Sequence, residues 1–258
     1  MPPIRALYNT ILDALFPVPK AEEELSSLTP ETAFEVLPRA PAYTGLAVSL
    51  PEARSIFAYK DERVSKLVWS LKYKRSARAA ALGGYALWRE LCAGAGVMCV
   101  PVKIHLPTGQ TGPINHSASS FEFSPEHTSL PLHAIIISMP ITPRRRRERG
   151  FNQCELLVDE IERLDKDGRF AIEKNLLMRV RHASRQTLKG RTDRLSSAKG
   201  VFAVNGEAAA RLRSSPRFEE MSIVVIDDVI TTGSTMREAL DALKKAGFAK
   251  ISGLSLAH

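Results

Sequence analysis

The clearest pattern in the chain is an uninterrupted apolar run that ends in two acidic residues. Residues 223–226 (IVVI) are β-branched and do not alternate with polar positions, which is typical of a strand covered on both faces in a parallel sheet. Asp227 and Asp228 follow directly, so they fall at the carboxyl end of that strand. Because ligands bind at this edge of open α/β sheets, the pattern predicts a ligand site around the two carboxylates.

A turn of small and hydroxyl-bearing residues comes next and opens a helix. The turn consists of Thr231, Thr232, Gly233, Ser234 and Thr235. Apolar residues then recur at helical spacing, with Thr235 and Glu238 placed as a capping box and Gly247 as the stop. The free N–H groups and positive dipole end of a helix attract a phosphate, which a glycine allows to approach closely. Residues 250–256 (KISGLSL) predict the next parallel strand.

Two other interpretations of this stretch stay open. An apolar strand ending in Asp-Asp also describes the magnesium-binding strand of a P-loop ATPase, although no G-x-x-x-x-G-K-[ST] precedes it. The other is an ordinary strand, turn and capped helix whose two carboxylates face solvent. Adjacent carboxylates beside a glycine and several hydroxyl residues favour the phosphate-binding interpretation over both.

A second segment combines a strand with a cluster of guanidinium groups. Residues 134–157 (AIIISMPITPRRRRERGFNQCELL) read as a short strand, a proline turn, an arginine cluster, and RGFNQ leading into a helix. Within it, Phe151 is expected in the core, and Asn152 and Gln153 are expected to orient the loop. Guanidinium groups match phosphate oxygens in pairs of hydrogen bonds, so the segment predicts a second anion-binding element.

Together these segments resemble the type I phosphoribosyltransferases, and more narrowly the ComF family. RGFNQ, the segment 176–204 (LLMRVRHASRQTLKGRTDRLSSAKGVFAV) and the "LKY" helix within residues 56–91 carry the narrower resemblance. The resemblance implies an α/β fold with a mostly parallel sheet flanked by helices. It also implies a phosphoribosyltransferase-like domain over 56–258 with a loop insertion at about 100–133. Residues 1–55 are expected to form an irregular N-terminal extension, because residues 17–55 are rich in Pro, Glu and Ser and show only weak periodicity.

The activity implied by the resemblance is transfer of a phosphoribosyl group from 5-phosphoribosyl 1-pyrophosphate to an unidentified nitrogen acceptor, with Mg²⁺ as cofactor. Asp227 and Asp228 would accept hydrogen bonds from the ribose hydroxyls and contact Mg²⁺ directly or through water. The 5-phosphate would lie against the turn residues 231–235. Arg145 and Arg149 would bind the pyrophosphate, and the alternative is an entirely solvated arginine cluster. Further substrate contacts would come from Gln186, Arg191 and Arg194, in a loop that closes over the substrate.

The resemblance also supports an alternative from another class, because the family is associated with competence and the chain has surplus arginines. In this alternative the protein is a non-catalytic accessory in DNA uptake or recombination, which binds single-stranded DNA or DNA-processing proteins and uses the pocket as a ligand sensor. A basic run surrounds the apolar residues of the "LKY" helix, and it consists of Lys60, Arg63, Lys66, Lys72, Lys74, Arg75 and Arg78. That run fits either a solvated helix face or phosphate contacts.

Composition sets the remaining bounds. The chain has 258 residues, 44% of them hydrophobic, and a formal net charge of +8, which suits one α/β domain with affinity for polyanions. No apolar run reaches membrane-span length, so a cytoplasmic protein without membrane contact is expected. The cysteines Cys92, Cys99 and Cys154 lack metal-ligand spacing, so the zinc ribbon common in the family is not expected. Neighbouring subunits often complete such sites, which makes a homo-oligomer an open expectation.

Overall fold

The computed structural model describes residues 20–41, 52–94, 134–180, 201–216, 218–220 and 222–258. A parallel sheet of five strands, in the order β1-β7-β6-β2-β3, forms its centre. These strands are β1 (Ala53–Phe57), β2 (Ala134–Ser138), β3 (Phe170–Ile172), β6 (Ile223–Val229) and β7 (Ile251–Ala257). A separate antiparallel pair is formed by β4 (Leu177–Arg179) and β5 (Phe202–Val204). The predicted fold class, a mostly parallel sheet flanked by helices, is confirmed.

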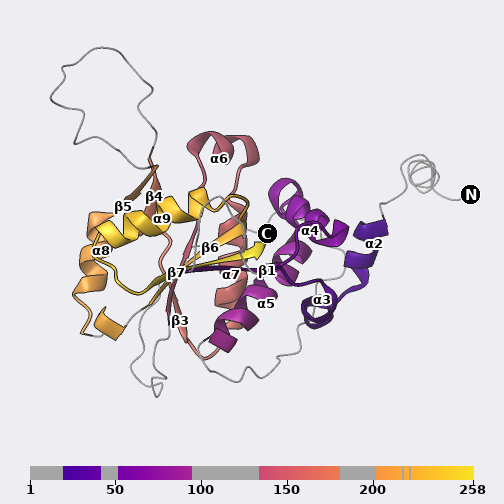
Figure 1. The fold of residues 1–258 in the computed structure, drawn as a ribbon, viewed down its shortest axis with the longest axis horizontal. Coiled ribbons are helices and arrows are strands. Elements are labelled where there is room, and N and C mark those ends of the chain that lie inside the picture. Colours follow the sequence, from indigo (N-terminus) through magenta and orange to yellow (C-terminus); the bar gives the residue numbers. More distant parts are fainter. Residues whose placement is uncertain (1–19, 42–51, 95–133, 181–200, 217, 221) are drawn as a thin grey trace, which may run out of the picture.

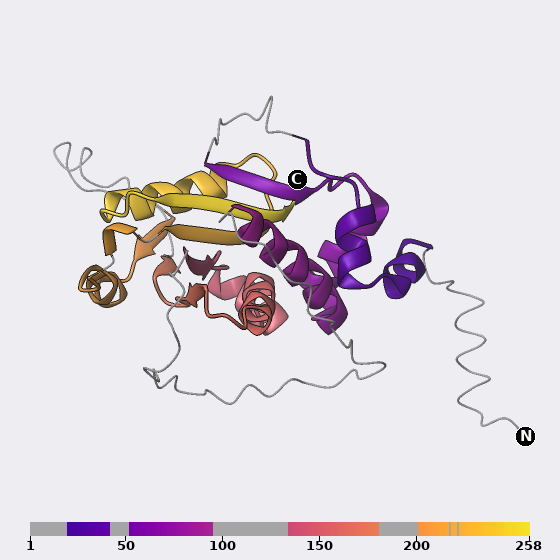
Figure 2. The same ribbon diagram turned by 90° about the horizontal axis from the view of Figure 1, so that it is seen from below.

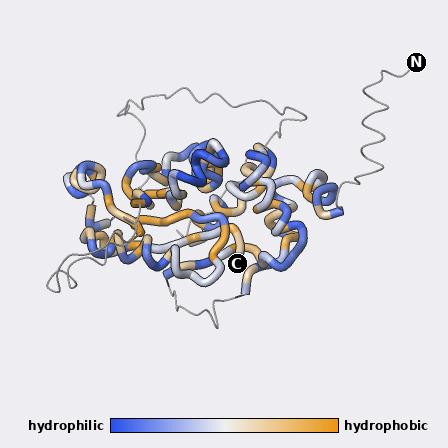
Figure 3. The backbone as a smooth tube through the Cα atoms, turned by 90° about the horizontal axis from the view of Figure 1, so that it is seen from above, coloured by the Kyte–Doolittle hydropathy of each residue, from blue (hydrophilic) through white to orange (hydrophobic). Residues whose placement is uncertain are grey.

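Helices cover both faces of this sheet (Figures 1 and 2). They are α2 (Lys20–Ser27), α3 (Pro30–Val36), α4 (Glu62–Lys74), α5 (Ala77–Gly94), α6 (Pro143–Arg149), α7 (Gln153–Leu164), α8 (Gly206–Arg213) and α9 (Ser234–Lys245), with a short 3₁₀ helix at Phe218–Glu220. Figure 2 shows α5 and α7 on one side of the sheet and α9 on the other. Hydrophobic residues concentrate in the central strands, as Figure 3 shows.

The strand β6 lies in the middle of the sheet and separates two apolar clusters. Its residues Val224 and Ile226 pack with α3, α4, α5 and α7, whereas Ile223 and Val225 pack with α8, α9 and the β4-β5 pair. Both flanking strands run parallel to it. The continuous apolar run is therefore explained by burial on both faces, as predicted, because successive side chains of a strand point to opposite sides.

Residues 20–36 correct one prediction for the N-terminal region. The irregular extension expected there instead contains α2 and α3, whose buried residues join the core beside α4 and α5. The start of α3 is set by Thr29, which accepts a hydrogen bond from the Thr32 amide, followed by Pro30 in the first turn. The weak periodicity hid these helices because both are short. The domain division after residue 55 stays a prediction, and the insertion at 100–133 lies outside the described residues.

No helix in the described part of the chain is long and apolar enough to cross a membrane.

Candidate functional site

Asp227 and Asp228 lie near the carboxyl end of β6, and both side chains are buried. Asp227 is only 9% exposed and Asp228 only 4%. The interpretation in which the two carboxylates face solvent is therefore wrong. The strand alternation directs them to opposite sides: Asp227 lies beside Cys154, and Asp228 lies beside α4. Two adjacent carboxylates thus occupy different surroundings in the middle of the sheet.

Asp227 is held by two donors. Its Oδ1 accepts a hydrogen bond from the amide of Asp228 at 2.9 Å and one from the thiol of Cys154 at 3.5 Å. Burial, together with the negative charge of Asp228, raises the pKa of Asp227 to about 7. Burial and the nearby carboxylates also raise the pKa of Cys154 well above its usual value. The sulfur is therefore a protonated hydrogen-bond donor at neutral pH.

Asp228 faces a lysine that was not assigned to the site from the sequence. The Nζ atom of Lys72, in the last turn of α4, lies 3.3 Å from Oδ2 of Asp228. This contact is an ion pair without hydrogen-bond geometry, since Oδ2 is buried with no hydrogen-bond partner among the described residues. The sequence placed Lys72 in the basic run of the "LKY" helix, but its spacing gave no sign of which face it occupies.

The predicted phosphate-binding turn lies directly after β6 at the start of α9. Gly233 is the N-cap residue, with a φ of 81°, a left-handed conformation that favours glycine. The hydroxyls of Thr232 and Ser234 lie 3.0 Å apart, and Thr231, Thr232 and Ser234 are exposed. The turn thus presents exposed hydroxyl-bearing residues at the start of α9.

The capping box predicted for this helix is wrong. The N-cap of α9 is Gly233, which makes no side-chain cap hydrogen bond, and Thr235 already lies inside the first turn. The helix ends as predicted, with Ala246 as the C-cap and Gly247 following at a φ of 88°. The Ser234 amide donates a hydrogen bond to the Thr232 hydroxyl at 3.4 Å, so a bound anion would compete with that hydroxyl at the start of α9.

The arginine cluster forms a helix, α6, that the sequence analysis did not predict. Thr142 caps it through the Arg145 amide, Pro143 occupies the first turn, and Gly150 ends it at a φ of 78°. The arginines differ in their surroundings, because Arg144 and Arg146 form exposed ion pairs with Glu148 and Glu155. Such surface pairs contribute little to stability.

Of the arginines assigned to phosphate, Arg149 is half-buried beside α4. Its guanidinium lies 5.0 Å from the ring centroid of Tyr73 and donates a hydrogen bond to Gln153 at 3.1 Å. Arg145 is exposed. Arg179, at the end of β4, is a further cation near this region. Burial lowers its pKa, and the nearby positive charge of Arg145 lowers it further.

Asn152 fixes the junction between β2 and α7. Its side chain accepts a hydrogen bond from the Cys154 amide and donates one to the carbonyl of Met139, each at 3.0 Å. This double contact places Cys154 beside Asp227. Phe151, expected in the core, is instead only half-buried, with the guanidinium of Arg75 at 5.8 Å from its ring centroid, because α7 begins after it and directs its apolar face elsewhere.

The remaining predicted substrate contacts, Gln186, Arg191 and Arg194, lie outside the described residues. Their segment connects β4 to β5, whose pairing is Leu177 with Val204 and Arg179 with Phe202.

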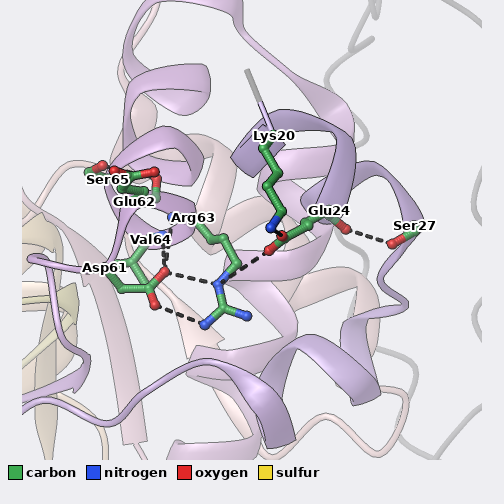
Figure 4. Close-up of polar contacts among 8 residues, drawn as sticks. All are labelled: Lys20, Glu24, Ser27, Asp61, Glu62, Arg63, Val64 and Ser65. Carbon is green, nitrogen blue, oxygen red and sulfur yellow. Dashed lines mark hydrogen bonds and ion pairs between the residues drawn. The ribbon is translucent and has the colours of Figure 1, made fainter. Parts of the chain in front are cut away.

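Much of the basic run on α4 is neutralised within the protein. Lys66 and Lys74 both pair with Glu22 of α2, at 2.6 and 2.7 Å. Arg63 binds Asp61, the N-cap of α4, and also reaches Glu24 (Figure 4). The solvated-face interpretation is therefore incomplete, since these cations join α4 to α2, and Lys72 is directed instead to the carboxylates of β6.

The donor atoms of Cys154, Asp227 and Asp228 lie within 4.8 Å of one another. The chemistry of this set fits a hard divalent cation such as Mg²⁺, because carboxylate oxygens are its preferred ligands. Oδ2 of Asp228, which has an ion pair with Lys72 but no hydrogen-bond partner among the described residues, is the clearest candidate ligand atom. A protonated thiol is a poor ligand, so Cys154 supports the carboxylate rather than the metal.

Comparison with known proteins gives matches over part of the chain. Residues 172–256 match the family model of the phosphoribosyl transferase domain. The chain is 33% identical over 130 residues to competence protein F of Haemophilus influenzae, covering 50% of this chain and 52% of that protein. It is 30% identical over 125 residues to competence protein ComFC of Bacillus subtilis (48% and 44%). It is 29% identical over 124 residues to DNA utilization protein YhgH of Escherichia coli K12 (48% and 49%). The chain spans about half the length of the curated relatives it matches.

Proposed function

Because the chain is a ComF-type phosphoribosyltransferase-like protein, we propose that it binds 5-phosphoribosyl 1-pyrophosphate with Mg²⁺ and transfers the phosphoribosyl group to a nitrogen acceptor. The observation that carries the proposal is the buried carboxylate pair on β6, directly before the open turn at α9. In this arrangement one end of the site suits sugar hydroxyls and the adjoining end suits a phosphate.

The reaction places two demands on the residues. In the transfer, the bond between C1 of the ribose and the pyrophosphate oxygen breaks, a bond from C1 to the acceptor nitrogen forms, and that nitrogen loses a proton. Asp227 and Asp228 would accept hydrogen bonds from the ribose hydroxyls, and their negative charge would stabilise the cationic character that develops on the sugar. The turn at 231–235 would hold the 5-phosphate through backbone amides and hydroxyls.

The departing pyrophosphate needs positive charge. Arg149 and Arg145 would supply guanidinium groups to its oxygens. Bound Mg²⁺, held by Asp227 or Asp228 directly or through water, would neutralise part of the same charge.

Turnover tests this function directly. The purified protein would receive Mg²⁺, ribose-labelled 5-phosphoribosyl 1-pyrophosphate, and separately purine and pyrimidine bases, ammonia and small amines, with pyrophosphate release as the measurement. We expect release with one class of acceptor. Gly233→Ala should reduce it at least tenfold, because a side chain strains the left-handed turn and obstructs phosphate approach.

Gly168→Ala is the matched control, since Gly168 also has a positive φ, of 63°, but lies in the turn after α7. This variant should retain the rate of the unmodified protein. Tight binding of the donor without pyrophosphate release for any acceptor would contradict catalysis and support the sensor function, whereas absence of binding would contradict both.

A second function, binding of single-stranded DNA, is favoured by an aromatic pair on α4. Trp69 and Tyr73 are 42% and 60% exposed, and their ring centroids lie 5.8 Å apart. The Nζ atom of Lys66 lies 4.5 Å from the centroid of Trp69. Exposed aromatic rings beside cations are the features on which nucleic-acid bases stack.

The double variant Trp69→Ala/Tyr73→Ala is expected to weaken binding of a fluorescent oligothymidylate by roughly tenfold or more, since stacking contributes about 1 to 3 kcal/mol per base. Fluorescence anisotropy at low and moderate salt would measure it. Tyr59→Ala, which removes a 40% exposed ring from the turn after β1, should leave the affinity unchanged. Equal affinity in the double variant would exclude this surface.

A further inference from the structure

The ion pair between Lys72 and Asp228 connects α4 to the candidate site. The Lys72 side chain is 23% exposed and that of Asp228 is 6% exposed, so the pair lies at the boundary between the interior and the solvent. At 3.3 Å and without hydrogen-bond geometry, the lysine compensates the carboxylate charge, but Oδ2 has no hydrogen bond from any described residue. A flexible four-carbon stem allows such a contact to be exchanged at low cost.

Other cations of α4 are directed away from the carboxylates of β6. Lys66 lies about one and two-thirds turns before Lys72 and Lys74 about half a turn after it. Both pair with Glu22. Arg63 pairs with Asp61 at the opposite end of the helix. The direction of Lys72 is therefore a property of its position on α4 and not of the general basic character of the helix.

A metal ion at Asp228 would compete with this lysine. Two cations close to one carboxylate oxygen repel each other, and the repulsion is large where the group is buried and water is scarce. A ligand that brings both Mg²⁺ and phosphate groups would offer the displaced ammonium a new partner, because its phosphate oxygens are anionic.

We propose that Lys72 is a displaceable counter-ion: it neutralises Asp228 in the ligand-free protein and moves to a phosphate oxygen of the ligand when a divalent cation takes its place at the carboxylate. This inference rests on the proposed binding of 5-phosphoribosyl 1-pyrophosphate and adds a positioning residue outside the matched segment 172–256. The neighbouring residue Tyr73 contacts Arg149, so the last turn of α4 would contact both the carboxylate and the arginine side of the site.

Lys72→Met separates this role from a structural one, because it should change two affinities in opposite directions. Mn²⁺ alone, measured by electron paramagnetic resonance at pH 8.5, should bind roughly tenfold more tightly, since a competing positive charge is gone. In the presence of Mg²⁺, 5-phosphoribosyl 1-pyrophosphate should bind roughly tenfold more weakly by calorimetry, since a charged hydrogen bond to phosphate is lost.

Lys66→Met is the matched control, since it removes the same side chain from the same helix but at a contact with Glu22. Both affinities should then stay within about twofold of those of the unmodified protein. Lys72→Arg keeps the charge, so its Mn²⁺ affinity should also be unchanged, and far-UV circular dichroism would verify that each variant folds.

The results distinguish this inference from the proposed function. If folded Lys72→Met binds Mn²⁺ no more tightly than the unmodified protein, displacement is wrong, even where the unmodified protein binds 5-phosphoribosyl 1-pyrophosphate. If the unmodified protein fails to bind that donor, the proposed function is wrong, and the transfer of Lys72 to phosphate is wrong with it. A rise in Mn²⁺ affinity in Lys72→Met would then still establish the competition at Asp228.

Discussion

Asp228→Asn is expected to weaken the binding of magnesium-bound 5-phosphoribosyl 1-pyrophosphate by roughly ten- to a hundredfold, the range that corresponds to loss of a charged hydrogen bond in a buried site. The residue is 4% exposed, and its Oδ2 has no hydrogen-bond partner among the described residues. Asparagine preserves the shape of the side chain but removes the charge that attracts a cation. It also replaces one acceptor oxygen with an amide nitrogen, which cannot accept a hydrogen bond from a ribose hydroxyl.

Isothermal titration calorimetry at fixed Mg²⁺ would measure this loss. The control is Asp159→Asn on α7, where the carboxylate forms a 2.9 Å ion pair with Lys174 away from the β6 pair, and its affinity should equal that of the unmodified protein. The double variant Lys72→Met/Asp228→Asn completes a cycle, and the two losses should not add, because each side chain faces the other. Unchanged affinity in Asp228→Asn would remove the basis of the proposed function.

Asp227→Asn is expected to stabilise the ligand-free protein, and increasingly so as the pH rises. Burial and the charge of Asp228 raise the pKa of Asp227 from 3.8 to about 7, so the folded state holds a proton that the unfolded state releases. For a raised carboxyl pKa, the favourable contribution is complete below about pH 4 and is lost as the pH rises through about 7. Asparagine does not ionise, so it avoids this loss.

The shift sets the size of the effect. At roughly 1.4 kcal/mol per pKa unit, the gain above pH 7 has an upper bound of about 4 kcal/mol. The realised gain is smaller, on the order of 2 kcal/mol, because Asp228 and Lys72 share the charge. The asparagine oxygen can still accept the hydrogen bonds now made by the Asp228 amide and the Cys154 thiol.

Urea unfolding of metal-free protein between pH 5 and 8.5 would measure this pH dependence. The difference between Asp227→Asn and the unmodified protein should widen from pH 5 to about pH 7 and level off above it, while Asp159→Asn should show a constant small difference. A stability gain that is independent of pH would indicate better packing and would contradict the buried ionisation.

The sequence predicted the parts of the fold whose signals are local. The apolar run of β6, the glycine at 233 and the apolar spacing of α9 lie within one continuous segment, so the strand, turn and helix could be inferred together. Helix α6 was missed because its residues show no apolar period, although Thr142, Pro143 and Gly150 are ordinary start and stop signals. The capping box failed because Gly233 begins the helix two residues earlier than the hydroxyl pattern suggested.

The parts of the site that were missed depend on contacts between distant segments. Lys72 is separated from Asp228 by most of the chain, and only the packing of α4 against the core directs its side chain to the carboxylate. Cys154 reaches Asp227 because Asn152 joins α7 to the end of β2. A single sequence shows that the lysine, the cysteine and the two carboxylates are present, but it does not show which of these side chains contact one another.

The alternation of Asp227 and Asp228 across β6 has a consequence for how this protein can diversify. Asp228 contacts the layer that contains α4. Asp227 contacts the start of α7 and lies on the side of the sheet that α9 covers. Substitutions in one layer therefore act first on one carboxylate and affect the other through the charge interaction between the two. Inserting or deleting a single residue in β6 would exchange the two environments and disable both together. The strand β6 therefore tolerates substitutions in the helices that cover it but not a change in its own length.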